Sequence, residues 1–282
     1  MAEEGEKDQK RWAIKDWFIA WGIVACLIGV PLLSLFAYSG IWLPMMVVSS
    51  GSMTHDDASF GHIGSIETGD VVIPKRAGID EVVTWEEGKE AGYMTYGDWG
   101  DVIIYRKNGD MNRPPVIHRA MVRIDKPKET NVTNIRGYRA QIEVEESQFG
   151  DGHFTVFITL WSPSGGLSAY RRSIKNVPLN TLITWGDHNR APDQISLPAA
   201  NGGLVRPIQK EWLVGVSRGE MPWMGLLALS IKSIFNPESI KLEDTPRDCW
   251  IMFGVVIACI VVALVLSEVL PPYMKRKKDR VA

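Results

Sequence analysis

Apolar residues are concentrated in two uncharged runs near the ends of the chain. The first extends from Trp17 to Ser39 and the second from Cys249 to Ser267. About 20 helical residues at roughly 1.5 Å each cross a hydrocarbon core of about 30 Å. Each run therefore predicts a membrane-spanning helix. Pro271 and Pro272 are expected to end the second helix before a basic tail.

The basic residues predict how these helices are oriented. Lys and Arg precede the first run and follow the second, and none occurs between Ser39 and Pro74. The positive-inside bias places both termini in the cytoplasm and the intervening region outside the membrane. A cleaved secretory signal is the alternative for the first run. Because the run is longer than a usual signal core, an uncleaved anchor is favoured.

Between the two runs, short segments rich in Val, Ile, Thr and aromatic residues are broken by Gly, Asn, Asp and Pro, a pattern typical of β-strands. A domain of roughly 180 residues can bury its own core. We expect it to be mainly β, with a β insertion or secondary lobe over about residues 125–177. The expected strands are Asp70–Pro74, Asp101–Arg106, Val116–Ile124, Ala140–Glu145, Phe154–Trp161, Leu182–Trp185 and Trp212–Ser217.

The apolar segment 221–229 is too short to cross a membrane. It predicts either an interfacial helix that contacts lipid headgroups or an ordinary core element. The predicted order is a cytoplasmic N-terminus at 1–16, a transmembrane helix at 17–40, an all-β extracytoplasmic domain at 41–220, an interfacial segment and linker at 221–248, a second transmembrane helix at 249–270 and a basic cytoplasmic tail at 271–282.

Composition narrows the possible function classes. The 282 residues are 45% apolar and carry a net charge of -2, which fits neither a nucleic-acid-binding protein nor a disordered one. Cys26, Cys249 and Cys259 fall inside the predicted spans. The exterior domain is therefore expected to have no disulfide framework and no thiolate metal site, and no cofactor is expected.

Small hydroxyl residues follow the first span in Ser49-Ser50-Gly51-Ser52-Met53. A serine becomes a nucleophile only when a base takes its proton, and a carboxylate usually orients that base. His118 is a candidate base, although a histidine within an apolar strand is more often structural. Asp187 and Asp193 are candidate carboxylates, although Gly-Asp-X-Asn is also an ordinary turn composition.

Together these segments resemble type I signal peptidases of the archaeal and endoplasmic-reticulum branch. The resemblance covers about Val47 to Trp223, apart from the insertion at 125–177. It rests on Ser50-Gly51-Ser52-Met53, on Gly100-Asp101-Val102-Ile103 leading to Val116-Ile117-His118-Arg119, and on Thr184-Trp185-Gly186-Asp187-His188-Asn189 with Asp193.

The resemblance implies a membrane-anchored β catalytic domain that removes signal peptides from secretory preproteins as a serine endopeptidase. Ser52 would be the nucleophile and His118 the general base. Asp193 would orient His118, with Asp187 as a supporting carboxylate. The Ser50 hydroxyl and the Ser52 backbone N–H would form the oxyanion hole. The implied partners are preproteins, the lipid bilayer and the protein translocation machinery.

Several features depart from this family pattern or leave alternatives open. His55 stands where the family usually has Pro, and it is a rival base for Ser52. Residues 81–99 form an apparent insertion, and Asn131-Val132-Thr133 is a glycosylation sequon. A non-catalytic membrane-anchored β binding module and an accessory subunit of a processing complex are the alternative functions. An alternative metal site would use His55, Asp56, Asp57 and His62.

Overall fold

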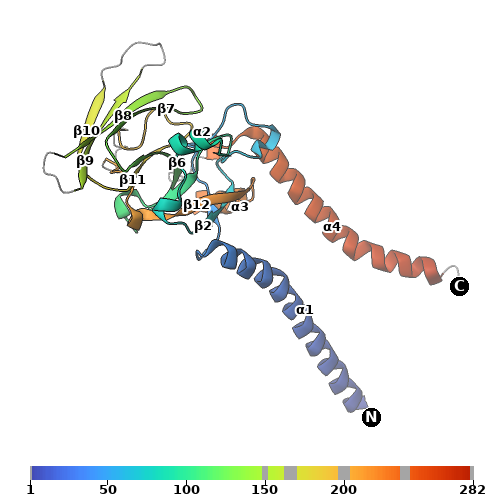
Figure 1. Ribbon diagram of the computed structural model, residues 1–282. Helices are drawn as coiled ribbons and strands as arrows, with labels where there is room; N and C mark the ends of the chain where they lie inside the picture. Colours follow the sequence, from blue (N-terminus) through green and yellow to red (C-terminus); the bar gives the residue numbers. More distant parts are fainter. Residues whose placement is uncertain (1, 148–151, 162–169, 196–203, 236–241, 280–282) are drawn as a thin grey trace. The chain divides into compact units, whose positions relative to one another are not determined.

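A computed structural model describes residues 2–147, 152–161, 170–195, 204–235 and 242–279. The chain divides into two compact units, residues 1–44 and 45–282. The first unit contains helix α1 (Ala2–Ser39), and the second contains the strands (Figure 1). The helices of the second unit are α2 (Trp85–Ala91), α3 (Leu226–Phe235) and α4 (Arg247–Asp279).

A six-stranded antiparallel sheet forms one part of the second unit. Its order is β1-β2-β12-β5-β6-β11, so strands from the beginning and the end of the domain lie side by side. The sheet curls, and β1 and β11 are its edges. Its strands are β1 (Met46–Val47), β2 (Val71–Lys75), β5 (Val102–Tyr105), β6 (Val116–Ile124), β11 (Thr181–Trp185) and β12 (Leu213–Met221).

The second sheet has four strands in the order β10-β9-β8-β7. It occupies the region expected to be a β insertion. A separate hairpin is formed by β3 (Met94–Thr95) and β4 (Asp98–Trp99). Asn131 of the sequon is exposed on β7. The four strands are β7 (Lys128–Thr133), β8 (Arg139–Glu146), β9 (His153–Leu160) and β10 (Arg171–Pro178).

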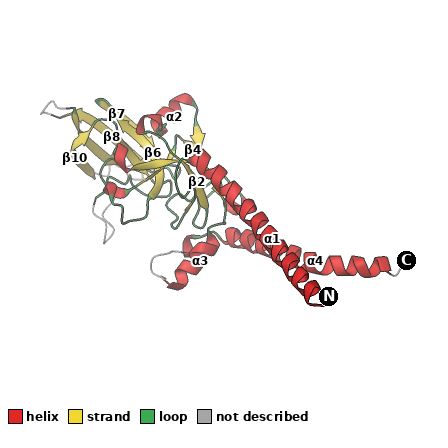
Figure 2. Cartoon of the chain, turned by 90° about the horizontal axis from the view of Figure 1, so that it is seen from below, coloured by secondary structure: helices red, strands yellow, loops and turns green. Residues whose placement is uncertain are grey.

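The mainly β expectation is confirmed, and β6 has the predicted bounds, Val116–Ile124. The expectation that the domain contains only β structure is wrong, because α2 lies within it and is drawn in red beside the yellow strands in Figure 2. Helix α2 is stabilised at its ends rather than by a long apolar stripe. Thr84 and Glu87 form a capping box, and Gly92 ends the helix in a left-handed conformation with φ 71°.

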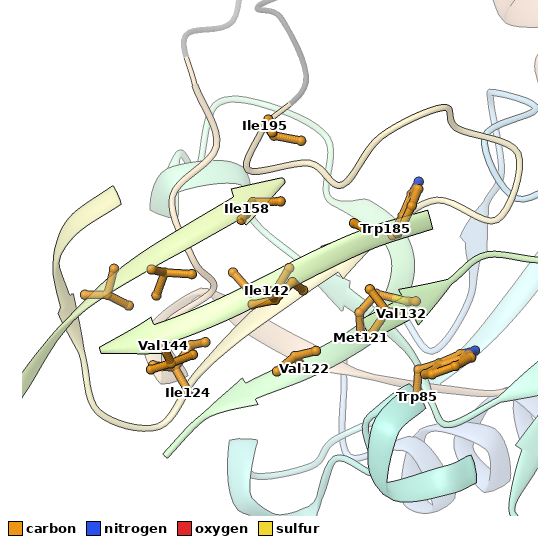
Figure 3. Close-up of a cluster of buried hydrophobic side chains, with 14 of the residues drawn as sticks. Trp85, Met121, Val122, Ile124, Val132, Ile142, Val144, Ile158, Trp185 and Ile195 are labelled. Atoms are coloured by element: carbon orange, nitrogen blue, oxygen red, sulfur yellow. The ribbon is translucent and has the colours of Figure 1, made fainter. Parts of the chain in front are cut away.

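The largest core cluster lies between the two sheets. Figure 3 shows side chains from β6 and β8, such as Val122 and Ile142, packed with Trp85 of α2. Strand β5 is buried on both faces, because Ile103 and Ile104 belong to different clusters on opposite sides of the strand. This double burial fixes β5 and its neighbour β6.

Among the described residues, two helical segments are long and apolar enough to cross a membrane. They are Trp21–Ser39, with a mean hydropathy of 2.0, and Arg247–Leu266, with a mean hydropathy of 3.0. Both are compatible with a membrane protein. The expected stop at Pro271 is wrong, because α4 continues to Asp279. A proline removes one N–H donor, and the remaining turns can stay helical. Residues 280–282 of the basic tail lie outside the described residues.

The apolar segment after β12 is partly core and partly surface. Leu226 and Leu229 are buried, whereas Leu227 and Ile231 are exposed on α3. The Leu226 side chain fills the space beside Gly69, where a Cβ would lie 2.2 Å from Leu226 Cδ2. Gly69 also has a φ of 103°, which favours glycine. The core expectation is therefore met on one side of α3, and the interfacial expectation for the exposed side stays a prediction.

Candidate active site

Ser52 lies in the turn after β1, and neighbouring residues hold this turn firmly. The Met53 side chain is buried beneath it. The His188 backbone N–H donates to the Ser52 carbonyl oxygen at 2.9 Å, and the Asp187 backbone N–H lies 3.5 Å from Met53 Sδ. The turn after β11 therefore positions the segment that carries Ser52. We refer to residues 49–55 as the nucleophile turn, after the role that the sequence predicts for Ser52.

His118 on β6 lies between Ser52 and Asp193. Its Nε2 is 2.9 Å from Ser52 Oγ, and its Nδ1 is 2.7 Å from Asp193 Oδ2. An ionised carboxylate only accepts hydrogen bonds, so Nδ1 carries the proton in this arrangement. In a neutral ring, Nε2 is then the acceptor for the Ser52 hydroxyl. The three groups thus form a hydrogen-bonded line with the polarity of a serine-activating triad.

Asp193 is held by two further donors. Tyr105 Oη and Thr184 Oγ1 lie 2.8 and 2.6 Å from Asp193 Oδ2. Burial raises the pKa of the Tyr105 phenol well above its ordinary value, and the neighbouring Asp193 raises it further, so the phenol remains a donor. The candidate line is therefore anchored through strands β5, β6 and β11.

Asp187 lies in a separate network. Arg119 binds it with both ends of its guanidinium group, Nε to Oδ1 at 3.0 Å and Nη2 to Oδ2 at 2.6 Å, and His55 Nε2 lies 2.8 Å from Oδ2. Burial alone would raise the pKa of Asp187, but Arg119 and the His55 hydrogen bond lower it below its ordinary value. An ionised, paired Asp187 connects β6 to the nucleophile turn.

The insertion at 81–99 encloses the Arg119 side chain. Arg119 Nη1 lies 2.9 Å from the Thr95 carbonyl oxygen and 3.2 Å from that of Asp98, at the hairpin of β3 and β4. Arg119 is fully buried. These carbonyl oxygens provide acceptors for the donors that Asp187 does not use, so one use of the insertion is to complete this buried charge site.

Replacing Arg119 by Ala is expected to lower the free energy of unfolding by about 3–5 kcal/mol, because a buried Asp187 carboxylate would lose its charged partner. Thermal unfolding of the purified protein in detergent would measure the loss. The exposed Arg139 offers a control through Arg139→Ala. The double variant Arg119→Met with Asp187→Asn should recover part of the loss. Equal melting temperatures for Arg119→Ala and the native protein would contradict this role.

Gly186 leaves room for Ser52 and His118. A Cβ at this position would lie 2.7 Å from the Ser52 carbonyl oxygen and 2.8 Å from His118 Nε2. Any side chain here would displace one of them. Tyr105, Thr184 and Gly186 had no role in the site predicted from the sequence. A hydroxyl within the apolar strand 102–105 is the signal that could have identified Tyr105.

An open groove of about 670 Å³ begins at Ser52 and His118. Met46, Val47 and Val48 line one wall, and residues 114–117 line the other. Ser50, Ser52 and Asn189 also line a second hollow of about 480 Å³ that includes Asp244. A chain bound in the groove could therefore continue past Ser52 in both directions. The Ser50 side chain is exposed at the junction, and its oxyanion-hole role stays a prediction.

The sequence offered His55 two alternative roles, as the base for Ser52 and as a metal ligand, and the structure shows neither arrangement. Its ring contacts Asp187, while His118 occupies the position next to the Ser52 hydroxyl. Within the described ranges, no group of three or more His, Cys, Asp or Glu residues could hold a metal ion. His62 instead lies 3.1 Å from Glu67 Oε1, an oxygen that also accepts from the His55 backbone N–H at 3.2 Å.

The loop that carries His62 connects the nucleophile turn to α4. The Gly61 backbone N–H donates to Asp248 Oδ2 at 2.6 Å, and His62 Nε2 lies 3.6 Å from Asp248 Oδ1. Glu67 is fully buried and contacts both histidines of the loop, His62 by its ring and His55 by its backbone N–H. The first turn of α4 is therefore joined to the nucleophile turn by a short series of polar contacts.

Two carboxyl groups beside Glu67 resist ionisation. Burial raises the pKa of Glu220 to about 7 and that of Asp70 to about 6. Glu67 adds to both shifts through charge repulsion. If the pKa of a carboxyl is higher in the folded than in the unfolded protein, the folded protein binds more protons than the unfolded one at pH values between these two pKa values. Stability is therefore lost as the pH rises towards the folded pKa.

We expect Glu220→Gln to raise the melting temperature by a few degrees at pH 8, with the difference shrinking towards zero near pH 5. The physical reason is that the amide removes the cost of ionising Glu220, while its oxygen can still accept from the Gly64 N–H. Thermal unfolding at a series of pH values measures the effect. Glu243→Gln, at an exposed position, is the control. A pH-independent effect would rule out ionisation as the cause.

Comparison of the chain with known proteins gave no match to a family model, a curated protein or a solved structure. The class of site is therefore defined by its own geometry, which is a Ser-His-Asp line at the end of a groove in a mainly β domain.

Proposed function

We propose that this chain is a membrane-anchored serine endopeptidase of the type I signal peptidase kind, which removes N-terminal signal peptides from secretory preproteins. The observation that carries the proposal is the hydrogen-bonded line from Ser52 through His118 to Asp193 at the end of an open groove. A serine that served only to form a surface turn would not require a buried histidine and a buried carboxylate hydrogen-bonded to it in this order.

In the proposed mechanism, Ser52 Oγ attacks the carbonyl carbon of the scissile peptide bond while His118 Nε2 accepts the hydroxyl proton. Asp193 keeps the Nδ1 proton in place and stabilises the charged imidazole. His118 then donates its proton to the leaving amine, and it later takes a proton from the water that hydrolyses the acyl-enzyme. The Ser52 backbone N–H and the Ser50 hydroxyl are proposed to bind the oxyanion.

The groove suits an extended peptide because both walls offer open strand edges. Among the described strands, β1 pairs only with β2. Strand β6 pairs with β5 from Val116 onward, but its pairing with β11 begins only at Arg119. Strand β11 therefore does not pair with the backbone of residues 116–118 on the groove side. A peptide in the groove could add a strand through main-chain hydrogen bonds, with specificity supplied by its side chains.

The membrane brings this site and its substrate together in the proposal. A signal peptide inserted through its apolar core presents its cleavage site near the bilayer surface. Chain length limits the distance of Ser52, because about 13 residues separate it from Ser39 and an extended chain spans at most roughly 3.5 Å per residue. Tethering both partners to one surface raises their effective concentration. We propose that the β domain is extracytoplasmic, that both termini are cytoplasmic and that the translocation machinery supplies the substrates.

The proposal is tested with the purified full chain in detergent and a radiolabelled secretory preprotein. We expect one cut after the apolar core of the signal peptide, located by sequencing the N-terminus of the product. The resemblance implies small residues at the first and third positions before the cut. A preprotein with large residues at both positions is the control and should remain intact. If the preprotein stays uncut, or if cutting is scattered along the mature part, the proposal fails.

A further inference from the structure

The second hollow at Ser52 contains a charged group that the proposed mechanism does not use. The hollow has a volume of about 480 Å³ and is lined by the nucleophile turn, by His188 and Asn189, and by Asp244. Asp244 is exposed and ends the short turn η6 (Leu242–Asp244), which precedes α4. A carboxylate beside a proposed nucleophile raises the question of which part of a substrate it contacts.

His188 adds no positive charge to this hollow. Arg136 Nη1 lies 2.8 Å from His188 Nε2, and the Thr54 carbonyl oxygen lies 3.2 Å from His188 Nδ1. A guanidinium group only donates and a carbonyl oxygen only accepts, so Nε2 is the acceptor and Nδ1 carries the single ring proton. Arg136 is itself paired with Asp56 at 3.4 Å. Asp244 is therefore the charged side chain among the described residues that line the hollow.

The position of Asp244 beside the nucleophile turn is fixed by the residue that follows it. The buried Thr245 donates its hydroxyl to the Thr68 carbonyl oxygen at 3.1 Å. A Cβ at Gly51 would lie 3.5 Å from Asp244 Cβ, so Asp244 is next to the residue that precedes Ser52. Within the described ranges, the Asp244 carboxylate takes no hydrogen bond and no ion pair. Both of its oxygens can therefore accept from a cation that enters the hollow.

The two hollows that meet at Ser52 differ in polarity, which indicates the part of a substrate that each one holds. The walls of the groove, residues 46–48 and 114–117, are apolar. In the proposed function the apolar core of the substrate lies before the cut, so we assign the groove to the signal peptide and the hollow of Asp244 to the mature part. An extended chain advances about 3.3 Å per residue, so the first three residues after the cut stay within roughly 10 Å of Ser52.

We propose that Asp244 is a specificity-determining residue that binds a Lys or Arg side chain within the first three residues after the cleaved bond. The inference rests on the proposed function, because it assumes that a peptide is bound across Ser52. The long stem of Lys or Arg can lie along the hollow while its cationic group reaches the carboxylate. The inference adds a charge preference on the mature side of the substrate, which neither Ser52 nor His118 can provide.

The test compares fluorogenic peptides that differ at one position only. Lys, Gln or Glu is placed at the first, second or third position after the cleaved bond. At the position that faces Asp244, we expect kcat/KM for the Lys peptide to exceed that for the Gln peptide about twofold to fivefold, and the Glu peptide to be the poorest. The difference should shrink at high salt, because ions screen an exposed pair.

Charge reversal provides the decisive comparison. Asp244→Lys should convert the preference for Lys into a preference for Glu at the same position, and Asp244→Asn should abolish the preference. Glu243→Lys is the matched control, because it makes the same change of charge at the neighbouring exposed residue, which does not line the hollow. It should keep the preference for Lys. If Lys gives no advantage at any position, or if Glu243→Lys reverses the preference as fully as Asp244→Lys, the subsite does not exist.

A binding measurement separates this inference from the proposed function. Fluorescence anisotropy of the same labelled peptides with the Ser52→Ala variant reports binding without cleavage. If the native chain cuts no peptide, but Ser52→Ala binds the Lys peptide more tightly than the Gln peptide and loses this difference when Asp244→Asn is added, the proposed function fails and the subsite stands. If all peptides are cut and bound equally well, the subsite fails and the protease stands.

Discussion

Replacing Ser52 by Ala is expected to lower the turnover number for preprotein cleavage about a millionfold, as the loss of a triad serine can. The Ser52 hydroxyl lies 2.9 Å from His118 Nε2, and the methyl group of Ala offers neither a nucleophile nor a donor for that nitrogen. Because Ser52 is only partly buried and its backbone carbonyl keeps the bond from His188, we expect the melting temperature to change little. Turnover is measured with a quenched-fluorescence peptide in detergent.

The control for this experiment is Ser59→Ala. Ser59 is exposed in the loop that follows the nucleophile turn, and its hydroxyl donates to the Ile63 carbonyl oxygen. It should retain native turnover. Wild-type turnover in Ser52→Ala would remove the nucleophile from the proposed mechanism and favour the alternative of a non-catalytic β binding module.

Asp193→Asn is expected to lower turnover about 10⁴-fold, which is the effect of the same change in a well-studied serine-protease triad. The Asp193 carboxylate accepts the Nδ1 proton of His118 at 2.7 Å. An amide in its place can turn an N–H donor towards Nδ1 and thereby favour the tautomer that has its proton on Nε2. His118 would then have no acceptor for the Ser52 hydroxyl. The turnover number and KM are measured together, and we expect the loss to appear in the turnover number rather than in KM.

Asp187→Asn provides the matched comparison at the other aspartate. Asp187 is bound to Arg119 and His55 rather than to His118, so this change should mainly lower the melting temperature. The two variants thus distinguish the carboxylate that acts on the base from the one that supports the fold. A 10⁴-fold loss of turnover in Asp187→Asn with unchanged stability would reverse the two roles.

The sequence predicted the strands that have a regular apolar pattern and missed those with only one buried side chain. Residues 116–124 contain enough buried positions to define β6 with its bounds. By contrast, β7 and β10 each bury only one side chain, and their apolar residues are too few to form a pattern. Helix α2 has seven residues, which is too short for a helical period. The capping pair Thr84 and Glu87 is the signal that could have identified it.

The sequence could nominate the residues of the candidate site but could not assign partners to the two aspartates. Asp187 and Asp193 follow the same strand, so their positions along the chain do not distinguish them. The assignment depends on β6, where neighbouring side chains point to opposite faces. His118 faces Ser52 and Asp193, while Arg119 faces Asp187. The burial of Arg119 depends in turn on carbonyl groups from the insertion at 81–99, which no local pattern reveals.

The contacts between Asp248, Gly61 and the loop of His62 give α4 a second role besides its proposed attachment to lipid. They join the first turn of α4 to the loop that Glu67 connects to the His55 backbone. Removing the C-terminal helix to obtain a water-soluble fragment would therefore also remove a support of the segment that carries Ser52. Biochemical work on this protein should therefore keep α4, because Asp248 contacts the loop that follows the nucleophile turn.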